Sequence, residues 1–350
     1  MQRNQRQLRF TALRQAFTLV EMLLVGAIIV ILAALTLVAV NKTRASAKET
    51  KTRATIQKLD VAMQQIFEMY ENKFAVIRHR VTHNYPALPG ETKEETKKRQ
   101  QKIATHFIRD LMRMELPQSW AEVYDSEDTD SPLGPITITL GGEDYTGEMS
   151  PLLDYYFAAY TNAKQTPSRA ALLFLIIQNL NPEALEAFHG SEVAANDDGM
   201  LEFVDAWGNP IQFLRWAPAF PGSDLQPDIL ALAGYVPKTK WEDNKTWWEE
   251  DPSAQDAKQT AQGDYPDPMD EQWNTVSWFL YPLIYSAGPD GIYGIGSDGS
   301  ENPQSPSVES GEILDPFAFP RGMPGNFENP WRNTLNHFDN IHNHRWYNSF

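Results

Sequence analysis

Hydrophobic residues follow two successive patterns in the N-terminal quarter of the chain. Residues 17–40 form an apolar run in which Glu21 is the only charged residue. Apolar positions then recur every three or four residues, which places them on one face of a helix. They are Ile56, Leu59, Met63, Ile66, Phe67, Tyr70, Phe74 and Ile77. Because no Pro occurs from residue 17 to residue 85, the sequence predicts one helix over residues 17–78, on the order of 90 Å long.

The two halves of this predicted helix are expected in different environments, the first in a membrane and the second against a folded domain. Residues 17–40 are apolar on every side, and about 20 such residues span a bilayer. Residues 41–80 continue the helix with one apolar face, which predicts a folded domain packed against it. Residues 1–16 form a leader without an acid, and its basic residues favour the cytoplasmic side of a membrane. These are Arg3, Arg6, Arg9 and Arg14.

The rest of the chain predicts mixed helices and strands. Residues 81–200 have the pattern of a helical insertion, in which a short strand at 136–140 ends at a Gly pair. Its expected helices cover residues 94–114, 150–163, 168–179 and 182–189. The predicted fold class is therefore α+β, in which a long N-terminal helix with a membrane-spanning first half packs on a small antiparallel β-sheet and carries this insertion.

The sheet is expected in residues 201–350. Residues 202–216 have the pattern of a strand, a turn and a second strand, with the turn at Gly208, Asn209 and Pro210. A further apolar strand is expected at 274–286. From residue 288 to residue 330 the chain is rich in Gly and Pro, so little regular structure is expected there.

Charge and composition exclude some classes of function. The chain has 350 residues and a net charge of −16, and subtracting the four Arg of the leader leaves −20. A surface this acidic argues against nucleic-acid binding, which needs a basic face. It suits a soluble face or one that binds cations. The chain has no Cys, so disulfides and thiol chemistry are excluded.

The segment around the start of the apolar run carries a specific combination of residues. A small residue, Ala16, precedes Phe17, and Glu21 is followed by fourteen apolar or small residues. This string resembles the cleavage and methylation signal of type IV pilins and type II secretion pseudopilins. The resemblance implies that a prepilin peptidase cuts between Ala16 and Phe17, so that Glu21 becomes the fifth residue of the mature chain. Ala16 departs from the family, which usually has Gly there, and a slower cleavage is expected.

The resemblance also implies a role for Glu21. A carboxylate in lipid is costly unless a positive charge meets it. In a pilus-like filament, the implied partner is the N-terminal amine of Phe17 in a neighbouring subunit, and this pairing selects one register of the packed helices. The alternative is a plain signal anchor in which Glu21 lies near the headgroups and has no further role.

Three segments are similar to the major pseudopilin of type II secretion in particular. Residues 205–210 resemble its Asp-x-Trp-Gly-x-Pro turn, and residues 285–294 resemble its Ser-x-Gly-x-Asp-Gly loop. Residues 339–344 are similar to its closing Asp-Ile-x-x-Trp element. In relatives the Ser-x-Gly-x-Asp-Gly loop surrounds a calcium ion that orders the β-region.

Calcium binds six to eight oxygen atoms, on loops that Gly allows to bend. The resemblance implies the Ser286 carbonyl, the side chains of Asp290 and Asp298, and Asp339 or Asn340 as ligands. About forty residues separate Asp298 from Asp339, whereas relatives keep this loop short, and Asn340 stands where relatives carry Asp. The alternative is a plain turn of Gly and Asp without a metal.

Other motifs in the sequence give weaker indications of function. Residues 294–299 match Gly-x-Gly-x-x-Gly by spacing, but they do not join a strand to a helix as a dinucleotide site requires. A transition-metal site at His337, His342 and His344 is an alternative to incidental histidines near a terminus. No zinc-protease helix, nucleophile elbow or phosphate-binding loop is present in the sequence.

The sequence therefore predicts a structural subunit of a type II secretion or type IV pilus-like filament, without catalytic activity. Its expected partners are homologous pilin-like subunits, the prepilin peptidase and inner-membrane assembly proteins of the secretion system. Its expected location is the bacterial inner membrane, with a cytoplasmic N-terminus and a periplasmic C-terminal domain, before it moves into a filament. Two alternatives are a minor subunit at the filament tip, suggested by the size of the chain, and a membrane-tethered enzyme or adhesin that uses the same signal.

Overall fold

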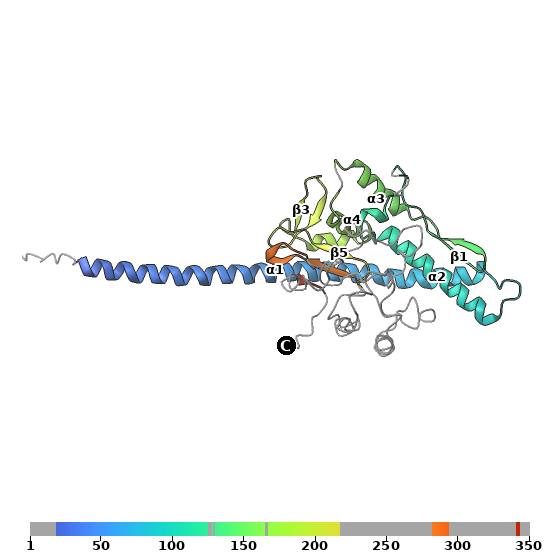
Figure 1. Cartoon of the computed structure of the whole chain (residues 1–350), viewed down its shortest axis with the longest axis horizontal. Coiled ribbons are helices and arrows are strands. Elements are labelled where there is room, and N and C mark those ends of the chain that lie inside the picture. The colour runs from blue at the N-terminus through green and yellow to red at the C-terminus, as the bar shows by residue number, and fades with distance from the viewer. Residues whose placement is uncertain are drawn as a thin grey trace, which may run out of the picture. The chain divides into compact units, whose positions relative to one another are not determined.

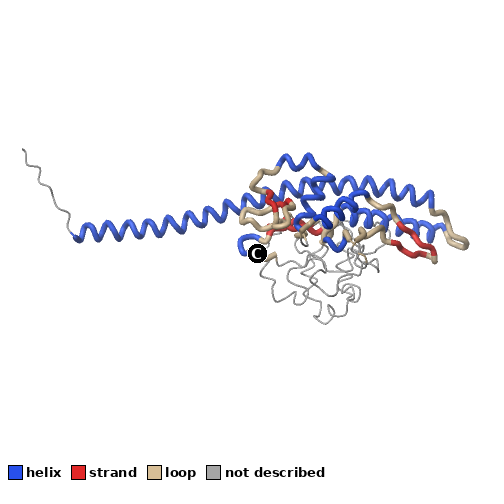
Figure 2. The backbone as a smooth tube through the Cα atoms, turned by 90° about the horizontal axis from the view of Figure 1, so that it is seen from above, coloured by secondary structure: helices blue, strands red, loops and turns tan. Residues whose placement is uncertain are grey.

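The computed structural model describes residues 19–124, 128, 130–164, 167–217, 282–293 and 341–343. The chain divides into two compact units, Met1–Lys48 and Glu49–Phe350, which are described separately below as the first and second units. Helices provide most of the described structure, and the strands, all in the second unit among the described residues, are short, as Figure 2 shows.

One helix, α1 (Leu19–Asn84), begins in the first unit and continues into the second (Figure 1, blue). The prediction of a single long helix is confirmed, and the helix extends six residues beyond the predicted end at residue 78. It ends two residues before Pro86, which disfavours helical conformation in the residue that precedes it.

The described residues of the second unit form three further α-helices, α2 (Lys93–Glu115), α3 (Pro151–Asn162) and α4 (Ala170–Leu180). All three lie where the apolar periodicity predicts them. Helix α2 begins with a capping box, in which the Thr92 hydroxyl accepts from the Glu95 amide and the Glu95 carboxylate accepts from the Thr92 amide. Helix α3 begins with Ser150 as N-cap and Pro151 in its first turn, both of which favour helix initiation.

A helix is also present where residues 182–189 predict one, but it is not an α-helix. The chain forms the 3₁₀-helix η2 (Pro182–Ala187) there, preceded by Asn181 in a non-helical conformation and followed by extended Phe188. Six residues between two such breaks are too few to offset the cost of nucleating an α-helix, and short 3₁₀ turns are common in such connectors. Another 3₁₀ turn, η1 (Trp120–Glu122), follows α2.

The described strands form three small antiparallel sheets, where the sequence predicted one. Strand β1 (Thr137–Leu140) pairs with β2 (Glu143–Thr146), and β3 (Val193–Ala195) pairs with β4 (Leu201–Phe203). The third sheet has the order β5-β6-β7. Its strands are β5 (Gln212–Leu214), β6 (Leu283–Ser286) and β7 (Ile341–His342). The α+β class is confirmed.

The two strands predicted around the turn at 208–210 belong to different sheets. Only one isolated bridge, between Val204 and Pro210, joins them directly. Pro210 has no amide hydrogen with which to continue a ladder, and the side chain of Asp205 accepts from two amides of the turn. The strands therefore pair outward, β4 with β3 and β5 with β6.

A large hydrophobic core holds the second unit together. Seven of the eight apolar positions that predicted the stripe on α1 are buried in it, from Ile56 to Phe74, and Ile77 is partly buried. The same core contains side chains of α2, α3 and α4, which lie in the predicted insertion, and of strands β4 to β7. The insertion and the β-region thus share one core on α1 rather than having separate ones.

Candidate functional site

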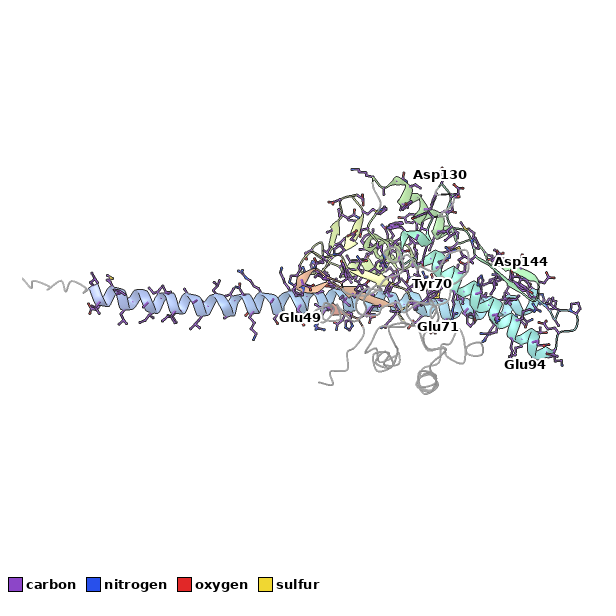
Figure 3. All side chains as sticks on the ribbon, in the orientation of Figure 1. Glu49, Tyr70, Glu71, Glu94, Asp130 and Asp144 are labelled. Carbon is purple, nitrogen blue, oxygen red and sulfur yellow. The ribbon has the colours of Figure 1, made fainter. Side chains whose placement is uncertain are left out.

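The first unit presents a continuous apolar surface on helix α1. Its large apolar side chains are exposed on all sides, as Figure 3 shows, with Leu19 78% and Ile31 59% exposed. The Thr36 and Thr43 hydroxyls donate to backbone carbonyls one turn back, at 2.9 Å each, so they are satisfied without water. Among the described residues this is the one helix long and apolar enough to cross a membrane, as a membrane anchor or a signal sequence must be.

Glu21 lies in the first turn of α1 and is exposed on this apolar surface. A carboxylate in the first turn of a helix interacts favourably with the amide groups at that end. The predicted cleavage site, Ala16 and Phe17, lies outside the described residues.

In the second unit, the buried carboxylate of Asp205 organises the turn that resembles pseudopilins. One oxygen accepts from the amides of Trp207 and Asn209, at 2.8 Å each. The other accepts from the Asn209 side-chain amide at 3.1 Å and from the Ser286 hydroxyl at 2.8 Å. Gly208 has a φ of 96°, which a residue with a Cβ rarely adopts. A buried carboxylate with this many donors is stable without a cation.

The turn and the second resembling segment lie in contact, although about eighty residues separate them in the sequence. The Asn209 side-chain amide donates to the Gly288 carbonyl at 2.7 Å, and the Gly288 amide donates to the Ser286 hydroxyl at 3.0 Å. The turn is also fixed to α1, because the Ala206 amide donates to the Thr52 hydroxyl at 3.0 Å. The structure therefore brings both segments together on the helix through hydrogen bonds of the protein itself.

Of the proposed calcium ligands, the structure describes Ser286 and Asp290. Ser286 is buried, and its hydroxyl is engaged by Asp205. Asp290 is exposed in the 3₁₀ turn η4 (Gly288–Asp290), and its carboxylate accepts from the Ile292 amide at 2.8 Å. Within the described ranges, no group of three or more His, Asp or Glu side chains is arranged to hold a metal.

The other proposed ligands, Asp298, Asp339 and Asn340, lie outside the described residues, as do His337 and His344. The described donors alone are fewer than the six to eight oxygens that calcium binds. His342 lies in β7 and is partly buried.

Two buried carboxylates that sequence reasoning missed join other elements of the second unit to α1. Glu115, at the end of α2, accepts from the Tyr70 hydroxyl at 2.7 Å, from the Lys73 ammonium at 2.5 Å and from the Ser150 hydroxyl at 3.0 Å. Burial, together with the negative charge of Glu115, raises the pKa of the Tyr70 hydroxyl well above its ordinary value. Tyr70 therefore stays protonated and acts as a donor.

Glu192, just before β3, accepts from the Thr55 hydroxyl at 2.5 Å, the Lys58 ammonium at 2.8 Å and the His189 amide at 2.7 Å. Burial raises the pKa of Glu192, but the hydrogen bonds from Lys58 and Thr55 outweigh it and hold this pKa below its ordinary value. Farther along the chain, the Asn343 side chain donates to Asp60 of α1 at 2.7 Å.

Two fully buried ion pairs fix the loops that follow α2. Arg215 donates two hydrogen bonds to Glu122, at 2.7 and 3.0 Å, and Arg113 donates to Asp110 at 2.8 Å. Arg113 also donates to the carbonyls of Glu122 and Gly134. In the sequence, the only indication of a buried ion pair here is that the charged Arg215 lies between the apolar residues Leu214 and Trp216. The sequence did not indicate its partner.

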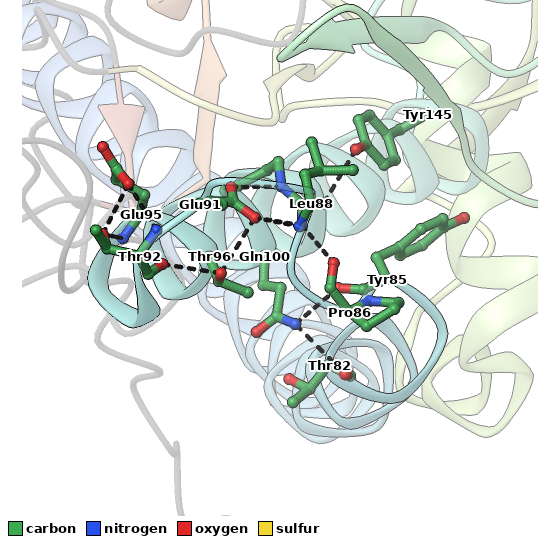
Figure 4. Close-up of polar contacts among 11 residues, drawn as sticks. Thr82, Tyr85, Pro86, Leu88, Glu91, Thr92, Glu95, Thr96, Gln100 and Tyr145 are labelled. Atoms are coloured by element: carbon green, nitrogen blue, oxygen red, sulfur yellow. Dashed lines mark hydrogen bonds and ion pairs between the residues drawn. The ribbon is translucent and has the colours of Figure 1, made fainter.

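The connection between α1 and α2 has its own polar network, drawn in Figure 4. Arg99 donates to both oxygens of Glu91, at 2.8 and 2.9 Å, and to the Pro86 carbonyl at 2.6 Å. The hydrogen bond from Arg99, with that from the Leu88 amide, lowers the pKa of Glu91 to about 2. Gln100 donates to the Tyr85 carbonyl at 2.8 Å. These contacts fix the turn that joins α1 to α2.

The described structure thus defines an α+β protein with a long apolar N-terminal helix. Comparison with protein-family models, with curated proteins and with solved structures gives no match.

Proposed function

We propose that this chain is a pseudopilin-like structural subunit of a type II secretion or type IV pilus-like filament. The observation that carries the proposal is the contrast within α1. Its first part has a continuous exposed apolar surface with Glu21 in the first turn, and its second part has a buried apolar face in a folded unit. A subunit that assembles through its N-terminal helix needs both features.

Cleavage before Phe17 gives the apolar run of residues 17–40 a second charge beside Glu21. It frees an α-amine four residues before Glu21, on an otherwise apolar helix. A carboxylate and an ammonium are each costly in lipid, whereas together they neutralise each other. Between neighbouring subunits, this pair sets the axial register of parallel helices, while apolar side chains supply the contact area.

The proposal includes the partners and the location. A prepilin peptidase processes the chain in the bacterial inner membrane, with the leader on the cytoplasmic side and the second unit in the periplasm. Inner-membrane assembly proteins of the secretion system then pass it to the filament. The filament moves or gates cargo mechanically, and this chain contributes no catalysis.

Glu21→Ala tests the proposal, with Glu68→Ala, an exposed acid farther along α1, as the matched control. We expect Glu21→Ala to enter membranes normally and to reduce filament assembly severely, and Glu68→Ala to assemble as the wild type does. Crosslinking between subunits and mass spectrometry of the mature N-terminus provide the two measurements. Normal assembly of Glu21→Ala, or a mature protein that still begins at Met1, would refute the proposal.

We also propose that calcium orders the β-region through Ser286, Asp290, Asp298, Asp339 and Asn340. The proximity of Ser286 and η4 to the buried turn at Asp205 supports this placement. Chelation with EGTA should lower the melting temperature of the second unit in the full chain, and added calcium should restore it. An unchanged melting temperature would refute the calcium proposal. It would mean that the hydrogen bonds of Asp205 stabilise the β-region without a metal.

A further inference from the structure

The part of the first unit that follows the apolar run is basic. Lys42, Arg44 and Lys48 lie within eight residues of Val40, and all three are exposed on α1. No acid occurs between Glu21 and Glu49 in a chain whose net charge is −16. These three residues are called the basic collar below. They give this part of α1 a positive charge, whereas the protein as a whole is negative.

The basic collar lies at the depth of lipid headgroups if residues 19–40 span the bilayer. At 1.5 Å per residue, Lys42 and Arg44 lie about 3 and 6 Å beyond Val40, and Lys48 lies about 12 Å beyond it. The headgroup layer on each side is about 5–8 Å thick. Long Lys and Arg side chains extend along a helix to place their charges in that layer, so all three reach it.

The directions of the three side chains distinguish between two possible partners. At 100° per residue, Arg44 and Lys48 lie about 40° apart around the helix, whereas Lys42 lies on the opposite side. A protein partner contacts one face of a helix, but headgroups surround the whole circumference. The distribution of charge therefore favours lipid over a second protein chain.

We propose that the basic collar binds the headgroups of anionic phospholipids in the leaflet next to the second unit. This inference rests on the membrane-spanning helix of the proposed function. Each Lys or Arg near an anionic surface strengthens binding about fivefold, and the effect is screened by salt. The bound lipids would hold α1 at one depth and keep its polar continuation out of the hydrocarbon.

The test uses the mature chain that begins at Phe17, and so lacks the four Arg of the leader, in phosphatidylcholine vesicles. Spin-labelled phosphatidylglycerol or spin-labelled phosphatidylcholine is the probe. Three chains are compared: wild type, Lys42→Gln/Arg44→Gln/Lys48→Gln, and the control Lys93→Gln/Lys97→Gln/Lys98→Gln. The control removes the same charge from exposed positions of α2. Resistance to alkaline extraction is measured first, to establish insertion of each chain.

We expect the wild type and the control to prefer phosphatidylglycerol about fivefold or more at low salt. The collar variant should insert equally well and lose most of this preference. An equal preference for phosphatidylglycerol in the collar variant and the wild type would overturn the inference. A collar variant that changes only self-association would also overturn it, because the partner of the basic collar would then be another copy of the chain. A wild type that fails to insert would overturn the proposed function as well, so the two failures are distinguishable.

Discussion

The two parts of helix α1 have the same backbone conformation, but different interactions stabilise it in each part. In the first unit, residues 25–32 include a run of β-branched Val and Ile, which are poor helix formers in water. Such a sequence is stable as a helix in lipid, where every backbone group must be satisfied within the segment. In the second unit, the helix is stabilised by its contacts, because its apolar face enters the core and its polar side chains bind carboxylates of other elements.

Under the proposed function, stability and assembly therefore depend on different parts of one helix. Exposed Ile31 belongs to the surface that other helices or lipid would cover, whereas buried Met63 and Ile66 belong to the core. Substitutions in the second unit should therefore change its unfolding, and substitutions in the first unit should change membrane or subunit contacts.

Breaking the ion pair between Arg215 and Glu122 should have the largest effect on the second unit. Glu122→Leu leaves the fully buried guanidinium of Arg215 without its carboxylate, and such a change costs about 3–5 kcal/mol. The melting temperature of the full chain in detergent, followed by tryptophan fluorescence, measures it. The double variant Glu122→Leu/Arg215→Met should recover part of the loss, because no charge is then left unpaired.

Ile31→Ala is the matched control for that experiment in the first unit. Its side chain is 59% exposed, so the same unfolding transition should be unchanged within about 0.5 kcal/mol. A melting temperature lowered as much by Ile31→Ala as by Glu122→Leu would show that the two parts of α1 are not independent in stability.

Removing the carboxylate that organises the turn should have an intermediate effect. Asp205→Ala leaves the buried hydroxyl of Ser286 and the partly buried donors of Trp207 and Asn209 without an acceptor, and we expect a loss of about 1–3 kcal/mol. Asp205→Asn keeps part of the acceptor and should lose less. The free energy of unfolding in urea provides the measurement. Equal losses for the two variants would mean that the turn depends on packing and not on these hydrogen bonds.

The sequence predicted the elements well because each has a local signal. The spacing from Ile56 to Ile77 specified the buried face of α1, Ser150 and Pro151 marked the start of α3, and the Gly pair after residue 140 marked a hairpin. Both glycines of that pair have positive φ, as a tight hairpin turn requires.

The pairing of strands and of buried charges could not be predicted, because it depends on residues far apart in the sequence. Glu192 meets Lys58 across 134 residues, and Arg215 meets Glu122 across 93. Nothing in either local sequence names its partner. For the candidate site, the sequence indicated that the segments at 205–210 and 285–294 matter, but not that Asp205, Asn209 and Gly288 join them.

The smallest predicted effect concerns the pH dependence of the contact between Glu192 and α1. The pKa of Glu192 is lower in the folded protein than its ordinary value of 4.5. Its contribution to stability is therefore complete above about pH 4.5 and is lost as the pH falls through the lower folded pKa. Lys58→Met removes the cationic donor, so it should destabilise the second unit by about 1 kcal/mol at neutral pH, since Lys58 is partly exposed.

The same variant should lose less stability than the wild type between neutral pH and about pH 3, because less of its stability depends on an ionised Glu192. Lys51→Met is the matched control, since Lys51 donates at 2.9 Å to the Ser191 hydroxyl, a group that does not titrate in this range. Its unfolding free energy should therefore follow the wild type with a constant offset. Parallel curves for Lys58→Met and the wild type would mean that the contact between Glu192 and α1 is maintained by Thr55 and the His189 amide, and that the ammonium of Lys58 adds little.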